Sequence, residues 1–206
     1  MRIRVKICGI TRIEDARAAV AAGADAIGLV FDPASARAVS IDQARTLAAA
    51  VPPFISVVGL FVNAPTDAIH AVLKQVPLSL IQFHGSETPE QCRQFGRPYI
   101  KAIHMRDHVD LHGEEKRYAD AAGLLLDAFV ADQAGGSGRT FDWARIPSDL
   151  TKPVILAGGL TPENVGEAIR RTRPSAVDVS SGVESAKGIK DVNKIAAFIK
   201  AVREAA

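Results

Sequence analysis

Eight short apolar segments recur along the chain, and this recurrence restricts the fold more than any other feature of the sequence. Their starts lie roughly 20 to 30 residues apart, which is the spacing of repeated strand-plus-helix units. Several are apolar almost throughout, as expected for parallel strands that are buried on both faces. The segments are residues 3–9, 26–31, 55–62, 78–85, 99–105, 123–129, 153–159 and 176–182. We therefore expect eight parallel strands.

Helical patterns separate many of these segments. One helix should end at Gly23, another should begin after Ser40 as its N-cap, and a third should begin with Thr161 as N-cap and proline in the first turn. Residues 106–122 show no clear pattern, and the helix after the sixth strand must be short. The sequence predicts helices over 14–23, 40–51, 161–172 and 191–206.

Eight alternations of strand and helix in one undivided chain indicate an α/β protein, a (β/α)8 TIM barrel in which residues 1–206 form a single domain. An open doubly wound sheet is the alternative. The barrel is favoured because eight units leave no strand over for a sheet edge or a second domain. In this fold, active sites lie at the C-terminal ends of the strands.

Composition narrows the function classes. Of the 206 residues, 48% are hydrophobic and 23% are charged, and the formal net charge of +2 is too small to favour nucleic acid or an anionic membrane as a partner. The apolar part of the N-terminus is too short for a signal peptide, and no apolar run reaches the ~18 residues of a membrane span. The two cysteines, Cys8 and Cys92, form no disulfide framework. We expect a soluble cytoplasmic protein.

Two side chains at strand ends are candidates for proton transfer. Alternation along the first strand puts Cys8 on the same side as Lys6 and Arg4, and alternation along LLLDAF puts Asp127 on the same side as Leu125. In a closed barrel the first and sixth strands are not neighbours, so Cys8 and Asp127 would face each other across the mouth. A reaction that removes a proton at one atom and delivers one at another needs such an arrangement.

Structural interpretations of these residues stay open. A free cysteine is a common small buried residue, and a buried carboxylate is often paired with lysine or arginine. Cys92 lies in a helical segment and is expected to serve packing only. Lys6 and Asp178, on the first and eighth strands, are expected to form a buried pair that orients the first strand, with a substrate role as the alternative.

Glycine-rich loops provide the clearest ligand signal. Gly158 and Gly159 follow the seventh strand, and Ser181 and Gly182 follow the eighth, where a short extra helix could begin. Loops at these two places form the recurrent phosphate site of the barrel fold. Gly136 belongs to a GGSG stretch after the sixth strand, which is either a loop that closes over substrate or holds phosphate, or a plain connector.

Two further residues at the catalytic end could contact a ligand. Arg37 follows the second strand and suits a carboxylate or phosphate, although an arginine in a loop is often only solvated. His84 ends the fourth strand and could bind substrate or form a structural hydrogen bond. The remaining histidines show no metal-ligand spacing, so we assign no metal; they are His70, His104, His108 and His112.

In sequence order, these motifs resemble one known family. KICGIT, FDPASAR, QFHG, LLLDA, GGSGRTFDW, LAGGLTPENV and DVSSGVE are similar to the phosphoribosylanthranilate isomerases of tryptophan biosynthesis. The resemblance extends from the first strand to the eighth. One departure is Ala36, which stands where the family usually has the proline of an S-P-R element.

The resemblance implies an Amadori rearrangement of N-(5-phosphoribosyl)anthranilate to 1-(2-carboxyphenylamino)-1-deoxyribulose 5-phosphate. It implies that Asp127 is the general acid that protonates the ribose ring oxygen and that Cys8 is the general base at the adjacent carbon. Arg37 would bind the anthranilate carboxylate, and the glycine-rich loops the phosphate. As a general base, Cys8 needs thiolate character, which nearby positive charge such as that of Lys6 promotes. No cofactor is expected, because the iminium intermediate makes the carbon-bound proton acidic.

Two other functions are kept as alternatives. One is another phosphate-binding barrel enzyme, such as a ribulose-phosphate epimerase or an indole-glycerol phosphate synthase. The other is a barrel that binds a phosphorylated metabolite without catalysis. The expected partner is the small-molecule substrate, with no nucleic acid or membrane, and the chain is expected to act as a monomer or a homodimer.

Overall fold

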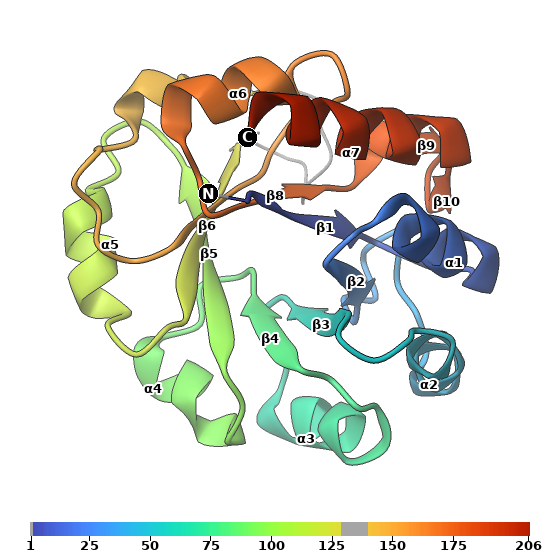
Figure 1. The fold of residues 1–206 in the computed structure, drawn as a ribbon. Helices are drawn as coiled ribbons and strands as arrows, with labels where there is room; N and C mark the ends of the chain where they lie inside the picture. The colour runs from blue at the N-terminus through green and yellow to red at the C-terminus, as the bar shows by residue number, and fades with distance from the viewer. Residues whose placement is uncertain (1, 129–139) are drawn as a thin grey trace.

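A computed structural model describes residues 2–128 and 140–206 and contains a closed barrel of eight parallel strands (Figure 1). The strands pair in sequence order, and β1 closes the ring against β8, with Lys6 opposite Asp178. The predicted barrel is confirmed, and the open sheet is wrong. The strands are β1 (Arg4–Cys8), β2 (Ala26–Val30), β3 (Ser56–Phe61), β4 (Leu80–Phe83), β5 (Tyr99–Met105), β6 (Gly123–Ala128), β7 (Val154–Leu156) and β8 (Ala176–Val179).

Helices surround the barrel on its outside (Figure 1). The α-helices are α1 (Ile13–Ala22), α2 (Ile41–Ala49), α3 (Thr66–Gln75), α4 (Pro89–Cys92), α5 (Leu111–Arg117), α6 (Val165–Thr172) and α7 (Val192–Ala205). The 3-10 turns are η1 (Arg93–Phe95), η2 (Trp143–Arg145) and η3 (Ser181–Val183), and a small antiparallel pair joins β9 (Glu184–Ala186) to β10 (Ile189–Lys190). Between residue 140 and β7, the structure has only the short turn η2, in agreement with the short helix expected there. None of the helices in the described ranges is both long and apolar enough to cross a membrane.

Local capping chemistry explains two helix boundaries that the sequence predicts correctly. Ser40 and Gln43 form a capping box in which each side chain bonds the backbone N–H of the other, so α2 begins directly after Ser40. Gly23 ends α1 in the left-handed conformation with φ of 99°, which costs glycine little because it has no Cβ.

The predicted start of the helix at Thr161 is wrong. The helix α6 begins at Val165, and residues 162–164 form a turn. The side chain of Asn164 faces backward along the chain, where Oδ1 accepts from the Thr161 N–H and Nδ2 donates to the Gly159 carbonyl. These bonds favour a turn over a first helical turn, and they hold the glycine-rich loop that precedes it.

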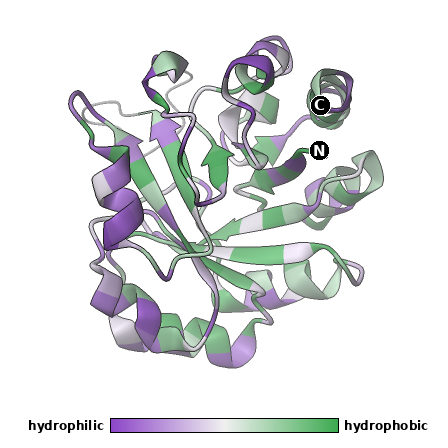
Figure 2. Cartoon of the chain, turned by 60° about the vertical axis from the view of Figure 1, so that its left-hand side comes forward, coloured by the Kyte–Doolittle hydropathy of each residue, from purple (hydrophilic) through white to green (hydrophobic). Residues whose placement is uncertain are grey.

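The alternation inferred along β6 is confirmed by burial. Leu124 and Leu126 are fully buried in the main core between the strands and the helices. Leu125 belongs instead to a small cluster inside the barrel with Ile100, Ala102 and Ala157. Hydrophobic colour accordingly runs along the strands, whereas hydrophilic colour concentrates on the outer helices and loops (Figure 2). The inward side of β6 therefore carries Leu125 below and Asp127 at the mouth.

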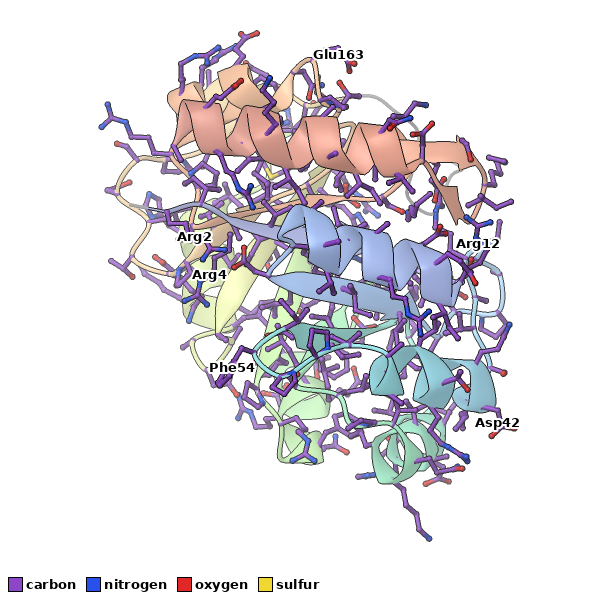
Figure 3. All side chains as sticks on the ribbon, turned by 45° about the vertical axis from the view of Figure 1, so that its right-hand side comes forward. Arg2, Arg4, Arg12, Asp42, Phe54 and Glu163 are labelled. Atoms are coloured by element: carbon purple, nitrogen blue, oxygen red, sulfur yellow. The ribbon has the colours of Figure 1, made fainter. Side chains whose placement is uncertain are left out.

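Exposed side chains before and after β1 show which side of the molecule holds the C-terminal ends of the strands. Arg4, which alternation puts on the same side as Lys6 and Cys8, is exposed at the start of β1. Figure 3 shows Arg2, Arg4 and Phe54 on one side of the molecule and Arg12, from the loop after β1, on the other. The C-terminal ends of the strands therefore lie on the side of Arg12.

Candidate active site

A cavity of about 580 Å³ lies at the C-terminal ends of the strands. This volume is in the ordinary range for a small-molecule site. The residues predicted from the sequence meet there, although they come from six segments of the chain. Those that line the cavity are Cys8, Arg37, His84, Asp127, Gly158, Gly159, Ser181 and Gly182. Gly136, the remaining predicted residue, lies outside the described residues.

Cys8 ends β1 at the wall of the cavity and is 5% exposed. It packs with Val30 on β2 and Leu60 on β3, the next two strands of the ring. Burial raises the pKa of the Cys8 thiol, and the opposing attraction of the Lys6 ammonium does not cancel this effect. Gly28 makes the position possible, because a Cβ there would come within 2.8 Å of the Cys8 sulfur.

Lys6 and Asp178 form the buried pair that the sequence predicts. The Lys6 Nζ lies 3.0 Å from both carboxylate oxygens, and the side chains are 7% and 8% exposed. Burial alone would lower the pKa of Lys6, but Asp178 and Cys8 outweigh it and the pKa is raised. Lys6 is therefore a fixed positive charge beside the Cys8 sulfur. Asp178 also lines the cavity.

Asp127 ends β6 opposite this group and is 8% exposed. Among the residues that the structure describes, its ion-pair partner is His84, with His84 Nε2 and Asp127 Oδ2 3.0 Å apart. The other ring nitrogen of His84 lies 2.9 Å from the amide nitrogen of Gln82. With the amide donating to Nδ1, the histidine proton lies on Nε2 and is donated to Asp127. His84 thus forms the structural hydrogen bonds that were one of its two predicted roles. It also lines the cavity, and its contact with substrate stays a prediction.

His104 also lines the cavity, although sequence reasoning assigned it no role in the site. Its ring lies 5.2 Å from that of His84, and its Nε2 bonds the His84 carbonyl at 3.0 Å. Ligand-type atoms of His84, His104 and Asp127 lie within 4.8 Å of one another, so the geometry could hold a metal ion. Burial lowers the pKa of His104, and so does the neighbouring His84. His104 lies near the end of β5, in register with Asp127 on β6, and this position near a strand end could have indicated from the sequence that it belongs to the site.

A buried lysine holds the loop that carries His84. Lys101, on β5, places Nζ 2.6 Å from the Gly85 carbonyl and 3.2 Å from Glu87 Oε2, and it also donates to the Phe83 carbonyl. The two carbonyls lie on either side of His84 in sequence. Sequence reasoning missed Lys101, although a lysine within the apolar run YIKAIHM was a visible signal.

The glycine-rich loops lie close against each other and against the Asp127 carboxylate. Gly158 has φ of 81°, and a Cβ there would meet the Ala128 nitrogen and come within 2.8 Å of Asp127 Oδ1. A Cβ on Gly182 would meet the carbonyl of Leu160 in the preceding loop. Any larger residue would therefore push the loops apart or displace the carboxylate. The turn η3 begins at Ser181, where a short extra helix was expected.

Arg37 extends into the cavity wall from the loop after β2. Ser35 organises this loop, because its Oγ accepts from the Arg37 N–H and its carbonyl accepts from the Ala38 N–H. The Arg37 side chain passes over Gly9, where a Cβ would lie 2.5 Å from Arg37 Cδ. Nε and Nη2 of Arg37 each lie 2.8 Å from a carboxylate oxygen of Glu184. Arg37 is thus held in place rather than freely solvated.

Comparisons with known proteins agree with the geometry. The family model described as N-(5'phosphoribosyl)anthranilate (PRA) isomerase matches residues 5–201. The N-(5'-phosphoribosyl)anthranilate isomerase of Pseudomonas putida strain GB-1 is 57% identical over 203 residues, which is 98% of each chain. A crystal structure of the Thermotoga maritima phosphoribosyl anthranilate isomerase has a TM-score of 0.91 and 44% identity, covering 98% of this chain and 99% of that one.

A second solved structure, at a TM-score of 0.87 and 41% identity over 98% of this chain and 99% of that one, is a phosphoribosyl anthranilate isomerase. It is in complex with reduced 1-(o-carboxyphenylamino)-1-deoxyribulose 5-phosphate. These matches cover nearly the whole barrel, including every strand end that contributes to the cavity. The chain therefore belongs to the N-(5'-phosphoribosyl)anthranilate isomerase family.

Proposed function

We propose that this chain isomerises N-(5'-phosphoribosyl)anthranilate in the cavity described above, with Asp127 as general acid and Cys8 as general base. Family membership supports the reaction, an Amadori rearrangement of an aminoaldose to 1-(2-carboxyphenylamino)-1-deoxyribulose 5-phosphate. The observation that carries the residue assignment is that these two groups, from β1 and β6, line one cavity from non-neighbouring strands.

In the first step the ribose ring opens. The protonated Asp127 carboxyl group gives its proton to the ring oxygen, the bond between this oxygen and carbon 1 breaks, and the nitrogen lone pair forms a carbon–nitrogen double bond. The product is an iminium ion with an open sugar chain. His84 orients the carboxyl group through its bond to Oδ2, and Lys101 fixes the loop on which His84 lies.

In the second step the Cys8 thiolate removes the proton from carbon 2. The released electron pair forms a carbon–carbon double bond and neutralises the iminium nitrogen, which gives an enolamine. Tautomerisation then adds a proton at carbon 1 and removes one from the hydroxyl group on carbon 2, which leaves the ketone. Because burial raises the pKa of Cys8, the positive charges of Lys6 and of the iminium ion must favour the thiolate at this stage.

The remaining cavity residues bind the two ends of the substrate in this proposal. Arg37 binds the anthranilate carboxylate, for which its planar guanidinium is suited. The backbone of Gly158, Gly159, Ser181 and Gly182 binds the phosphate, since two glycine-containing loops meet there and line the cavity. A phosphate role for Gly136 rests on the sequence resemblance alone. We further propose that the chain is a one-domain enzyme of the cytoplasm, either a monomer or a homodimer.

The two alternative functions, another phosphate-binding barrel enzyme and a non-catalytic barrel, fit these observations less well than the isomerase does. A different phosphate-binding barrel enzyme would not match this isomerase family over residues 5–201. A non-catalytic barrel would not need an acid and a base on opposing walls. The chemistry itself requires no cofactor, because the iminium ion withdraws the electrons that a metal or an organic group would otherwise accept.

The test follows the fluorescence of the substrate, made in situ, while purified protein consumes it. Cys8→Ser and Asp127→Asn should each lower kcat by about 10²- to 10⁴-fold, the usual range for loss of one proton-transfer group. Cys92→Ser is the matched control, because Cys92 is buried in the outer core and lies outside the cavity lining. A kcat within tenfold of wild type for either cavity variant would overturn the assignment of that residue.

A further inference from the structure

Behind Arg37 lies an ion pair that the proposed reaction does not use. Arg37 lines the cavity, whereas its partner Glu184 and the lysine bound to Glu184, Lys190, are absent from the lining. Both carboxylate oxygens of Glu184 accept from Arg37 at 2.8 Å. A bidentate pair of this kind fixes the plane of the guanidinium as well as its distance.

Glu184 is itself fixed from the other side. Lys190 Nζ lies 2.9 Å from Glu184 Oε1, and it also donates to the Ser180 carbonyl at 3.1 Å. The side chains of Glu184 and Lys190 are almost fully buried. Burial alone would raise the pKa of Glu184, but the bonds from Arg37 and Lys190 outweigh it and the pKa is lowered. Glu184 is therefore an ionised, rigid anchor that joins the Arg37 loop to the loop after β8.

This arrangement leaves a second edge of the guanidinium for a ligand. The Glu184 pair uses Nε and Nη2, so the hydrogens of Nη1 and the second hydrogen of Nη2 are not part of it. One hydrogen of Nη1 and the second hydrogen of Nη2 point along parallel directions and match the two oxygens of a carboxylate. Because the edge toward Glu184 is fixed, the direction of the second edge is fixed too.

We propose that Glu184 is a positioning residue that determines recognition of the anthranilate carboxylate by orienting Arg37. The inference rests on the proposed function, in which Arg37 binds that carboxylate. It explains how the loop can hold the arginine with Ala36 in place of a stiffening proline, because the orientation comes from the segment after β8, on the other side of β1. Gly9 contributes by leaving room for the arginine stem between β1 and the loop after β8.

The experiment measures the binding of two ligands by isothermal titration calorimetry. One ligand is reduced 1-(o-carboxyphenylamino)-1-deoxyribulose 5-phosphate, and the other is the matched compound made from aniline, which lacks the carboxylate. Glu184→Gln should weaken binding of the carboxylate ligand by about 5- to 10-fold, the cost of ordering one long side chain on binding, and change binding of the aniline compound less than about twofold. Glu184→Asp keeps the charge, but the aspartate side chain is too short to bond both Nε and Nη2 of Arg37. This variant should therefore also lose the preference for the carboxylate ligand over the aniline compound.

Glu204→Gln is the matched control, because Glu204 pairs with Lys200 on the exposed side of α7. Retained binding of the aniline compound shows that each variant is folded and that its phosphate loops are intact. If Glu184→Gln keeps the full preference for the carboxylate, or weakens both ligands equally, the positioning role is wrong while the Arg37 subsite stands. If the wild-type protein shows no preference for the carboxylate, the subsite in the proposed function fails as well, and with it the inference.

Discussion

The substitution Lys6→Met removes the positive partner of a buried carboxylate. Lys6 Nζ lies 3.0 Å from both oxygens of Asp178, and the side chains are 7% and 8% exposed. Methionine keeps most of the apolar stem, so the main loss is electrostatic. Removal of one partner from a buried ion pair costs about 3–5 kcal/mol, because the other charge stays buried without compensation.

This cost can be measured as a shift in thermal unfolding. For a chain of this size, 1 kcal/mol corresponds to roughly 2–4 °C, so the Tm of Lys6→Met should fall by about 6–20 °C in differential scanning calorimetry. Adding Asp178→Asn removes the orphaned charge and should recover much of the loss. Lys200→Met is the control, because its pair with Glu204 is exposed, and it should change the Tm by less than about 2 °C.

Two results would refute this reasoning. Either Lys6→Met melts within about 2 °C of the wild-type protein, or the double variant is no more stable than the single one. The substitution also bears on the thiol, since burial raises the pKa of Cys8 and Lys6 opposes that rise. Lys6→Met, made in a Cys92→Ser background, should therefore move alkylation of Cys8 by iodoacetamide to higher pH. A shift to lower pH would contradict the electrostatic account.

Three further predictions concern pH, the glycine-rich loop and backbone strain. The active enzyme carries one proton on the Asp127 carboxyl and none on the Cys8 thiol. This form holds the same number of protons as the form with a neutral thiol and an ionised carboxyl, so the two stay in a fixed ratio as the pH changes. The active fraction therefore declines once the pH exceeds the thiol pKa. Because burial raises the pKa of Cys8, the alkaline limb of kcat/KM should lie above the ordinary pKa of a free cysteine, and a limb below it would contradict the buried position. Gly158→Ala should lower kcat by at least tenfold, roughly the effect of a small misplacement of Asp127, while circular dichroism shows an intact barrel; an unchanged kcat would show that the carboxylate tolerates the added Cβ. Phe54 is wholly exposed with φ of 72°, so Phe54→Asn should raise the free energy of unfolding in urea by up to about 1 kcal/mol, and a decrease would mean that the ring is packed in solution.

The barrel and its opposing pair could be predicted because strands have a simple period. Near-continuous apolar runs indicate strands that are buried on both faces, and eight of them in order suit a closed ring. Alternation along a strand then decides which residues face inward. It correctly put Leu125 and Asp127 on the inner side of β6, and it paired Lys6 with Asp178 across the closing strands.

Partners that come from distant segments could not be predicted in this way. Glu184 lies 147 positions from Arg37 in the sequence, and periodicity says which face a residue takes but not which side chain it meets. The bond from His84 to Asp127 likewise joins residues that are far apart in the sequence, so periodicity could not predict it. The incorrect start of α6 has a different cause: a threonine followed by proline favours a turn as well as a helix start, and the side chain of Asn164 selects the turn.

The central claim is that an acid and a base reach one sugar from opposing walls of the barrel. A crystal structure of the Asp127→Asn variant with N-(5'-phosphoribosyl)anthranilate tests it most directly, because this variant should bind the substrate and convert it too slowly to lose it. We expect the Cys8 sulfur within about 4 Å of carbon 2 and the amide introduced at position 127 within about 3.2 Å of the ring oxygen, on opposite faces of the sugar. A substrate with carbon 2 turned away from Cys8, or with both side chains on one face, would contradict the account.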